Sequence, residues 1–410
     1  MKVNLRLVLM AAAVMVLTSG SGVTLNLDRV QQRYPWNGFV DIDYTIADVS
    51  GDVNDYIVKV TVTADSQEWV AQHFKGLAWC DLPTTVGKHR VTWDSAADGA
   101  NFISKNVSVK IDLLYAPVTA ADADYAIVDL SAGVEGTSYP VRYVCGPEMP
   151  SSQFNQPVYR TTKLVLKRVK AGEFWMGDNN VSSGTARFRA RLTEDYFLGV
   201  FPVTQKQYLS VVGGKNPSKY TNDMDGNPVD ERPIETVSYD TISGSQGFLA
   251  KINAKALCRG SAVDGFALPT EAEWEYACRA GCEKKYFWDS DDSADIGDYA
   301  WWQGNASSIT HACGSKLPNA WGFYDIIGNV WEWTRAWRIT YPAYSADSVW
   351  EDPQASTGTS ITVRGGSCNN YADVALWRSG YRSQALNPTG NWVNYGVGGP
   401  LGFRLSLSAK

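Results

Sequence analysis

The sequence predicts a two-domain protein, an all-β sandwich followed by a larger domain that mixes short helices with loops. Three observations carry this prediction. The chain has 410 residues, more than one hydrophobic core normally organises. Apolar and polar residues alternate with period two from Val23 to about Cys145, as in half-buried strands. Helix-capping signatures appear only later, in a composition whose 36 Gly, 16 Trp and 21 Tyr indicate many turns and aromatic-lined surfaces.

Residues 1–22 have the three parts of a secretory signal peptide. Lys2 and Arg6 form a charged start, Leu7–Leu17 an apolar core, and Ser19–Gly22 a cleavage zone of small residues. A membrane anchor is the alternative, but the apolar run is about half of the ~20 residues that span a bilayer. No later segment is apolar for long enough to cross a membrane. We therefore expect a secreted or periplasmic protein after cleavage.

Seven cysteines remain after the signal peptide, an odd number in a compartment that permits disulfides. At least one of them is expected to stay outside the chain's own disulfides. The sequence leaves the connectivity open. The 37 basic and 43 acidic residues give a net charge of -6, which argues against nucleic acid as a partner.

Residues 23–145 are predicted to form an immunoglobulin-like β-sandwich. Val40–Ile46 and Tyr56–Val62 place apolar side chains at every second position. Glycine, aspartate and proline turns separate these runs from further ones, as in a sandwich of short strands. The further strands are predicted at His89–Trp93, Val107–Leu113, Tyr125–Leu130 and Val141–Val144.

A linker is predicted at residues 146–160, which are rich in Pro, Ser and Gln and show no periodicity. The second domain then occupies residues 161–410. Thr204 and Thr270 each begin a capping box, with Gln207 and Glu273 three residues later. Three helices are predicted, from Thr204 to Val212, from Tyr239 to Leu257 and from Thr270 to Cys278.

The helix that follows Pro269 carries Trp274 and, besides the capping Glu273, two further acids. We expect Trp274 to pack in the core. Glu271 and Glu275 lie four residues apart and are expected to cap the helix or face solvent, where acids near a helix N-terminus favour the dipole.

The second domain contains a succession of short motifs in a fixed order. They are Gly172–Gly177, Pro202–Gln205, Asn216–Ser218, Arg232–Ser238, Leu268–Ala277, Asn319–Trp333, Arg364–Ser367 and Gly402–Arg404. This succession resembles the formylglycine-generating enzyme, or sulfatase-modifying factor, family over essentially the whole domain. The resemblance implies an α+β, loop-rich fold related to C-type lectins, and an exported protein or peptide, for example a sulfatase, as the partner.

A calcium site is predicted where the chain reads from Asp325 to Glu332. Two carboxylates flank backbone carbonyls, a set of hard oxygen donors that suits calcium. By resemblance to the family the ligands would be Asp325, Gly328, Val330 and Glu332. The alternative is a turn in which the acids contact backbone amides or arginines.

The family's catalytic step depends on two cysteines that hold copper(I), a soft ion that prefers thiolates. Counted from Ser367, those positions fall on Asn370 and Ala375, which supply no thiolate, so copper is not expected. Ser367 and Trp331 match two other active-site positions of the family. Cys368 is the nearest thiol, and an incidental cysteine is favoured over a nucleophile.

Two functions therefore remain open. One is a sulfatase-modifying oxidase relative with altered metal ligands. The other is a non-catalytic binding protein on the lectin-like scaffold, because the segment after Ser367 is rich in Asn, Tyr and Trp, as recognition loops are. This segment also resembles the variable proteins of diversity-generating retroelements. The predicted ligand-binding residues are Asn369, Asn370, Tyr371, Trp377, Tyr381, Asn391, Trp392 and Tyr395.

Overall fold

The computed structural model divides the chain into two compact units, residues 1–119 with 144–146, and residues 120–143 with 147–410. The structure describes residues 17–19, 23–33, 38–49, 51, 53–100, 107–145, 151–178, 187–222, 228–338, 348–355, 357–358, 360–370, 374–386 and 400–410. Of the predicted ligand-binding residues, Tyr371, Asn391, Trp392 and Tyr395 lie outside the described residues.

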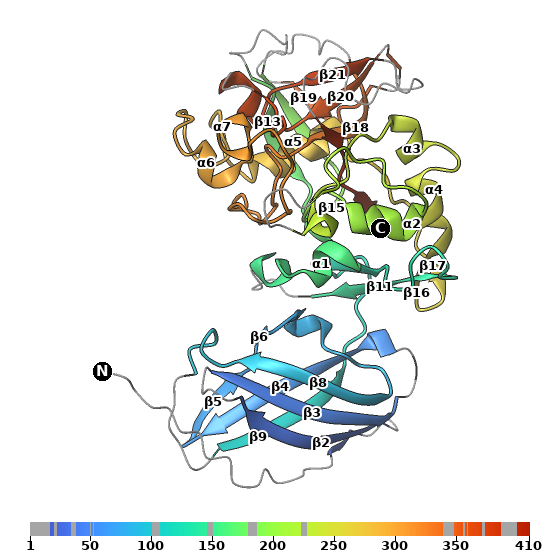
Figure 1. Ribbon diagram of the computed structural model, residues 1–410, viewed down its shortest axis with the longest axis vertical. Coiled ribbons are helices and arrows are strands. Elements are labelled where there is room, and N and C mark those ends of the chain that lie inside the picture. The colour runs from blue at the N-terminus through green and yellow to red at the C-terminus, as the bar shows by residue number, and fades with distance from the viewer. Residues whose placement is uncertain are drawn as a thin grey trace. The chain divides into compact units, whose positions relative to one another are not determined.

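The first unit is built from two β-sheets (Figure 1). One sheet has the strand order β1-β2-β3-β8-β6-β7, and the other has the order β5-β4-β9. The strands are β1 (Leu17–Ser19), β2 (Val23–Gln32), β3 (Phe39–Asp48), β4 (Tyr56–Ala64), β5 (Gln67–Val70), β6 (His73–Phe74), β7 (Leu77–Ala78), β8 (Gly87–Asp94) and β9 (Val107–Tyr115). The four strands predicted in this stretch correspond to β3, β4, β8 and β9.

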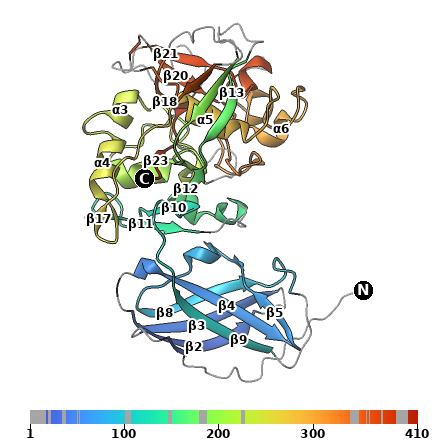
Figure 2. The ribbon, with the colours of Figure 1, turned by 180° about the vertical axis from the view of Figure 1, so that it is seen from behind.

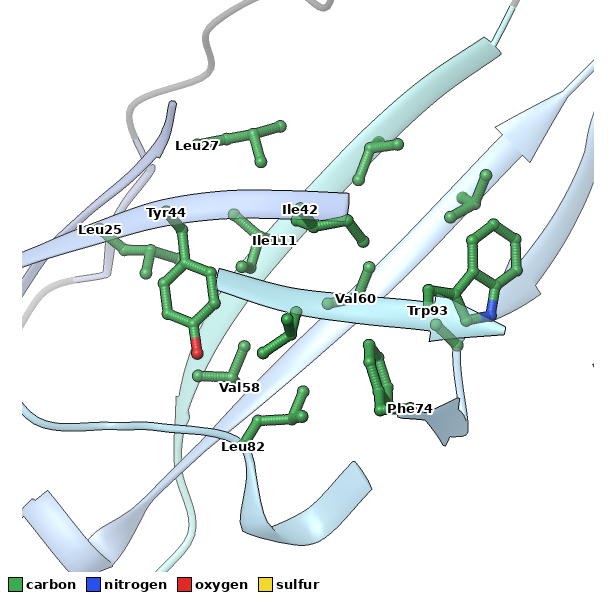
Figure 3. Packing of buried hydrophobic residues seen from close by; sticks show 14 of the residues in the cluster. Leu25, Leu27, Ile42, Tyr44, Val58, Val60, Phe74, Leu82, Trp93 and Ile111 are labelled. Carbon is green, nitrogen blue, oxygen red and sulfur yellow. The ribbon is translucent and has the colours of Figure 1, made fainter. Parts of the chain in front are cut away.

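Side chains from both sheets share one apolar core. Ile42 and Trp93 contribute from the first sheet, and Val60 and Ile111 from the second (Figure 3). Strand β3 alternates between half-buried and buried positions along most of its length, as period-two alternation predicts. The unit is therefore a two-layer β-sandwich.

The second unit combines three sheets with short helices (Figure 2). The strand orders are β17-β16-β11-β10-β12-β15-β23, β13-β14-β19 and β21-β20-β18-β22. The strands are β10 (Tyr125–Asp129), β11 (Tyr139–Val144), β12 (Lys163–Val169), β13 (Gly172–Met176), β14 (Phe188–Leu192), β15 (Tyr196–Gly199), β16 (Ala256–Cys258), β17 (Ser261–Ala262), β18 (Trp331–Trp337), β19 (Val349–Glu351), β20 (Ser360–Arg364), β21 (Ser383–Leu386), β22 (Leu401–Gly402) and β23 (Ser406–Ser408).

The last two strands predicted for the sandwich belong to this second unit instead. β10 pairs with β12 antiparallel, and β11 pairs with β16 parallel. The end of the predicted linker also lies in the second unit, because Phe154 and Tyr159 are fully buried and their rings meet edge to face. Period-two alternation identifies a strand but does not specify which strand it pairs with. The linker was predicted from its Pro- and Ser-rich composition, which gives no indication that two of its aromatic residues belong to a core.

Two helices begin at the predicted capping boxes. α2 (Gln205–Val212) is capped by Thr204, and α5 (Glu271–Arg279) by Thr270. The predicted helix from Tyr239 to Leu257 is divided into α3 (Tyr239–Ser243) and α4 (Phe248–Lys255). The remaining helices and 3-10 turns are α1 (Val158–Thr161), α6 (Ile296–Tyr299), α7 (Gln303–Ala306), η1 (Val53–Asp55), η2 (Trp79–Asp81), η3 (Ser151–Phe154), η4 (Val229–Glu231) and η5 (Val374–Trp377). Among the described residues, no helix has both the length and the apolar character that a membrane crossing requires.

Candidate functional site

A glycine turn follows β20 and presents Ser367. Gly365 and Gly366 have φ angles of 95° and 72°, in the left-handed region that favours glycine. A Cβ on Gly366 would lie 2.6 Å from the Trp377 ring, and one on Gly365 would lie 3.0 Å from the Ile326 carbonyl oxygen. Both glycines are therefore required by conformation and by close packing.

This turn is joined to the segment that precedes β18. The Gly328 amide donates to the Gly365 carbonyl oxygen at 2.8 Å, and the Cys368 amide donates to the Asn329 carbonyl oxygen at 3.0 Å. Asn329 in turn holds the chain at His311 through its side-chain amide. The two predicted site segments thus lie side by side as one backbone unit.

Asn370 closes the turn onto Ser367. Its Oδ1 accepts from the Ser367 amide at 2.8 Å and from the Ser367 hydroxyl at 2.7 Å. The backbone N–H of Asn370 donates to the Ser367 carbonyl oxygen at 3.0 Å. Both residues are buried. The Asn370 side chain therefore has a structural role in the turn, because its oxygen accepts two hydrogen bonds from Ser367.

Three buried thiols of this unit, those of Cys278, Cys313 and Cys368, are poorly suited to metal binding. Cys368 is fully buried, and burial raises its pKa. Burial also raises the pKa of Cys278 to about 12 and that of Cys313 well above its ordinary value. Metals bind the thiolate, which such environments disfavour. The described residues contain no group of three or more His, Cys, Asp or Glu that could hold a metal ion.

Asp325, the first predicted calcium ligand, is buried. Its Oδ2 accepts from the Gly314 amide at 2.7 Å and its Oδ1 from the Asn329 side-chain amide at 3.2 Å. Burial raises the pKa of Asp325 to about 6, against the lowering effect of these hydrogen bonds and of Arg404. The carboxyl is thus held by polar donors in a dry setting.

Glu332, the last predicted calcium ligand, forms an ion pair instead. Arg404 binds both of its oxygens, with contacts of 2.7 and 3.0 Å, and the Trp274 indole N–H donates to it at 2.7 Å. The side chains of Glu332 and Arg404 are 0% exposed. In this structure the Glu332 oxygens accept from Arg404 and from the Trp274 indole, which is the arrangement expected from the alternative of a turn whose acids contact backbone amides or arginines. Calcium binding by Asp325, Gly328, Val330 and Glu332 stays a prediction.

Glu271 and Glu275 do not face solvent, contrary to the expectation from their helical positions. Both are fully buried. Arg382 binds Glu271 through two contacts of 2.5 and 2.8 Å, and Arg279 binds Glu275 at 2.9 Å. Arg364 contacts both glutamates. The network fixes the strand that leads into the Gly365–Gly366 turn. Trp274 is buried as predicted.

Comparison with known proteins identifies the second unit. A family model described as the sulfatase-modifying factor enzyme 1-like domain matches residues 150–405. The chain belongs to the sulfatase-modifying factor family. The residues of the turn and of the segment before β18 lie inside the matched range, so the family resemblance inferred from the motifs is confirmed.

Several curated members of the sulfatase-modifying factor family are similar to this chain. The formylglycine-generating enzyme of Streptomyces coelicolor is 32% identical over 181 residues, which are 39% of this chain and 51% of that enzyme. The mouse enzyme is 34% identical over 141 residues, 30% of this chain and 37% of that enzyme. The bovine protein named inactive Cα-formylglycine-generating enzyme 2 is 26% identical over 286 residues, 58% of this chain and 90% of its own. The chain thus spans about half or less of the two enzymes.

Solved structures similar to this chain include two bacterial proteins. Treponema denticola variable protein 1 is 26% identical, with a TM-score of 0.49, and the match covers 60% of this chain and 96% of that one. PvdO from Pseudomonas aeruginosa is 23% identical, with a TM-score of 0.44 and coverage of 60% and 94%.

The two sulfatase-modifying factor positions predicted as catalytic both lie deep in the fold. Ser367 is fully buried, and Trp331 is 1% exposed. The Trp331 ring lies 6.2 Å from that of Tyr381. Among the predicted ligand-binding residues, Asn370 and Trp377 are buried, whereas Asn369 donates to the Tyr220 hydroxyl at 3.2 Å. Asn370 and Trp377 therefore support the turn, and ligand binding by the predicted residues stays a prediction.

The arginines are the site residues that motif reading missed. Arg364 and Arg404 occur inside two of the quoted motifs, Arg-Gly-Gly-Ser and Gly-Phe-Arg, yet neither was assigned a role. An arginine that adjoins glycines and apolar residues is a candidate for a buried ion pair, since arginine is rarely fully buried without a partner. That signal indicates burial but not the identity of the partner.

Proposed function

We propose that this protein is an exported, non-catalytic ligand-binding member of the sulfatase-modifying factor family. The observation that carries the proposal is the contact between Asn370 and Ser367. Asn370 stands where the family's first copper cysteine is expected, and its side chain is hydrogen-bonded within the turn. The second position is Ala375, which has no donor atom in its side chain.

The chemistry of copper(I) supports this proposal. A soft, singly charged ion needs soft donors such as thiolates, and an amide oxygen and a methyl group are not substitutes. Cys368 lies two residues before Asn370, but it is buried and its pKa is raised. A lone, protonated thiol does not form a bis-thiolate site. We therefore derive no oxidation step through copper.

A relative supports the proposal by analogy. The bovine protein whose name calls it inactive matches 58% of this chain, a larger share than either enzyme described above. We infer that the scaffold can be retained without the oxidase reaction. The family's link to sulfatases makes an exported sulfatase or another exported peptide the natural class of partner.

Binding would use the segment that follows Ser367. The Asn-, Tyr- and Trp-rich composition of residues 368–400 suits recognition, because rigid aromatic rings anchor and asparagines adapt their hydrogen bonds. In its narrower form the proposal makes this a retroelement-diversified variable protein. The signal-peptide pattern of residues 1–22 supports export, and the two-layer sandwich supports an immunoglobulin-like spacer domain.

The alternative is an active oxidase with other metal ligands. It is favoured by 32–34% identity to formylglycine-generating enzymes and by the retained Ser367 and Trp331. Its catalytic metal would need donors other than the two missing cysteines.

A copper(I) titration against a competing chelator tests the proposal. The Streptomyces coelicolor formylglycine-generating enzyme serves as the positive control, and the chelator concentration is set so that this enzyme retains its copper. Under those conditions we expect this chain to lose its copper, because Cys368, the thiol closest in sequence to the two missing cysteines, is buried and its pKa is raised. Retention of one equivalent that a Cys368→Ser variant loses would contradict the proposal.

A further inference from the structure

A cavity of about 410 Å³ opens in the second unit between β15, β23, the start of α5 and β18. Thr193, Glu273, Arg335, Asp352 and Ser406 are among the residues that line it. Its volume lies in the range of small-molecule sites, roughly 300–1,000 Å³. None of its lining residues belongs to the 364–381 segment, so it is separate from the turn described above.

The lining includes a fixed carboxylate. Glu273 accepts from the Thr270 amide at 2.8 Å as part of the α5 capping box, and from Arg335 Nη2 at 3.1 Å. Its side chain is 14% exposed. Burial raises the pKa of Glu273. This carboxylate is held in place by the helix cap and orients Arg335.

Arg335 brings unused donors to the same cavity. Its backbone amide donates to the Pro269 carbonyl oxygen at 2.9 Å, which ties β18 to the start of α5. Its side chain is 40% exposed. Within the described part of the chain Nη2 contacts Glu273 and Nη1 has no acceptor, whereas Nε is buried and out of a ligand's reach. A guanidinium edge with open N–H groups matches the two oxygens of a carboxylate.

Asp352 supplies the opposite charge. Its carboxylate accepts from the Thr193 amide at 3.0 Å and from the Thr193 hydroxyl at 2.5 Å. No lysine or arginine among the described residues forms an ion pair with it, whereas the other acids of the lining, Glu194, Asp195 and Glu273, each have one. The cavity therefore presents an uncompensated carboxylate together with a guanidinium that has open donors.

We propose that this cavity binds a small zwitterion, an amino acid or a dipeptide, with its ammonium on Asp352 and its carboxylate on Arg335. The ligand is electrically neutral overall, and each of its charged ends meets a group of opposite sign. The remaining lining includes the polar residues Thr270, Gln354 and Ser406, which accommodate hydrogen-bonding substituents. A diamine would satisfy Asp352 but leave Arg335 unused.

Calorimetric titration of the full chain with diglycine and L-glutamine tests this site. The comparison ligands are diglycine with an acetylated amine, diglycine with an amidated carboxylate, and cadaverine. At least one zwitterion should bind about ten-fold more tightly than its blocked forms, since each loses one charged contact. Absence of binding by both zwitterions, or equal binding by the blocked forms, would overturn the proposal.

Two variants assign the two ends. Asp352→Asn keeps an oxygen for Thr193 and removes the charge, and Arg335→Gln removes the guanidinium. Each should weaken zwitterion binding about ten-fold, and thermal melting checks that each variant is folded at the temperature of the titration. The matched controls are Asp289→Asn and Arg189→Gln, whose side chains are 84% and 41% exposed and lie outside the cavity lining. If cadaverine bound with the same affinity as the zwitterions, and Arg335→Gln left that affinity unchanged, the cavity would be a simple cation site and the zwitterion proposal would be excluded.

Discussion

Replacing Arg404 with methionine should lower the free energy of unfolding of the second unit by about 3–5 kcal/mol. The variant leaves the fully buried Glu332 without its cation, and among the side chains that the structure describes only the Trp274 indole continues to donate to it. Arg404 also donates to the carbonyl oxygens of Gly199 and Tyr324, which lose a partner. Urea denaturation followed by hydrogen exchange at β18 measures this unit separately from the sandwich.

Two controls separate charge burial from general damage. The double variant Arg404→Met with Glu332→Leu removes both charges and should recover most of the loss, because an apolar pair needs no compensation. Lys410→Met breaks an ion pair with Glu194 whose lysine is 70% exposed, and should cost less than about 1 kcal/mol. If Arg404→Met proved as stable as Lys410→Met, Glu332 would have another partner and the assigned ion pair would be wrong.

Replacing Arg364 with methionine should cost the second unit at least about 3 kcal/mol, because two buried carboxylates lose a shared cation. In this variant Glu271 keeps its ion pair with Arg382, and Glu275 keeps its ion pair with Arg279. The carbonyl oxygens of Ser379 and Tyr381 lose the hydrogen bonds that Arg364 donates to them. We therefore expect faster hydrogen exchange in the segment around Tyr381 in addition to the loss of stability.

The Arg364→Lys variant is the matched control for charge. Lysine keeps the positive charge but lacks the planar fork that reaches two carboxylates and two carbonyl oxygens, so it should recover only part of the loss. Full recovery by lysine would show that charge alone matters. Unchanged exchange near Tyr381 in Arg364→Met would contradict the role assigned to the backbone contacts.

The sequence predicted those helices whose starts depend on residues only a few positions apart. The capping boxes at Thr204 and Thr270 gave α2 and α5, since both partners lie within three residues. The single helix predicted from Tyr239 to Leu257 is interrupted at Gly244. A Cβ at this position would lie 2.5 Å from the Asp240 carbonyl oxygen. Glycine there permits the close turn that separates α3 from α4.

Ion-pair and strand partners that lie far apart in the sequence could not be predicted from it. Arg364 and Glu275 are 89 residues apart, and Arg382 and Glu271 are 111 apart, so no spacing rule connects them. The partner of β10 is also a property of the whole fold, because a strand pattern specifies its faces and not its neighbour. By contrast, the bond between Ser367 and Asn370 spans three residues and lies within reach of turn chemistry.

The most direct test of the non-catalytic proposal is the reaction itself. A Cys-x-Pro-x-Arg peptide is incubated with the protein, copper(I) and dioxygen, beside the Streptomyces coelicolor formylglycine-generating enzyme, and mass spectrometry follows the aldehyde. Because Asn370 is bonded to Ser367 and Ala375 offers no ligand, we predict no aldehyde under conditions where that enzyme converts the peptide. Aldehyde that appears with this protein and disappears in Cys368→Ser would contradict the proposal.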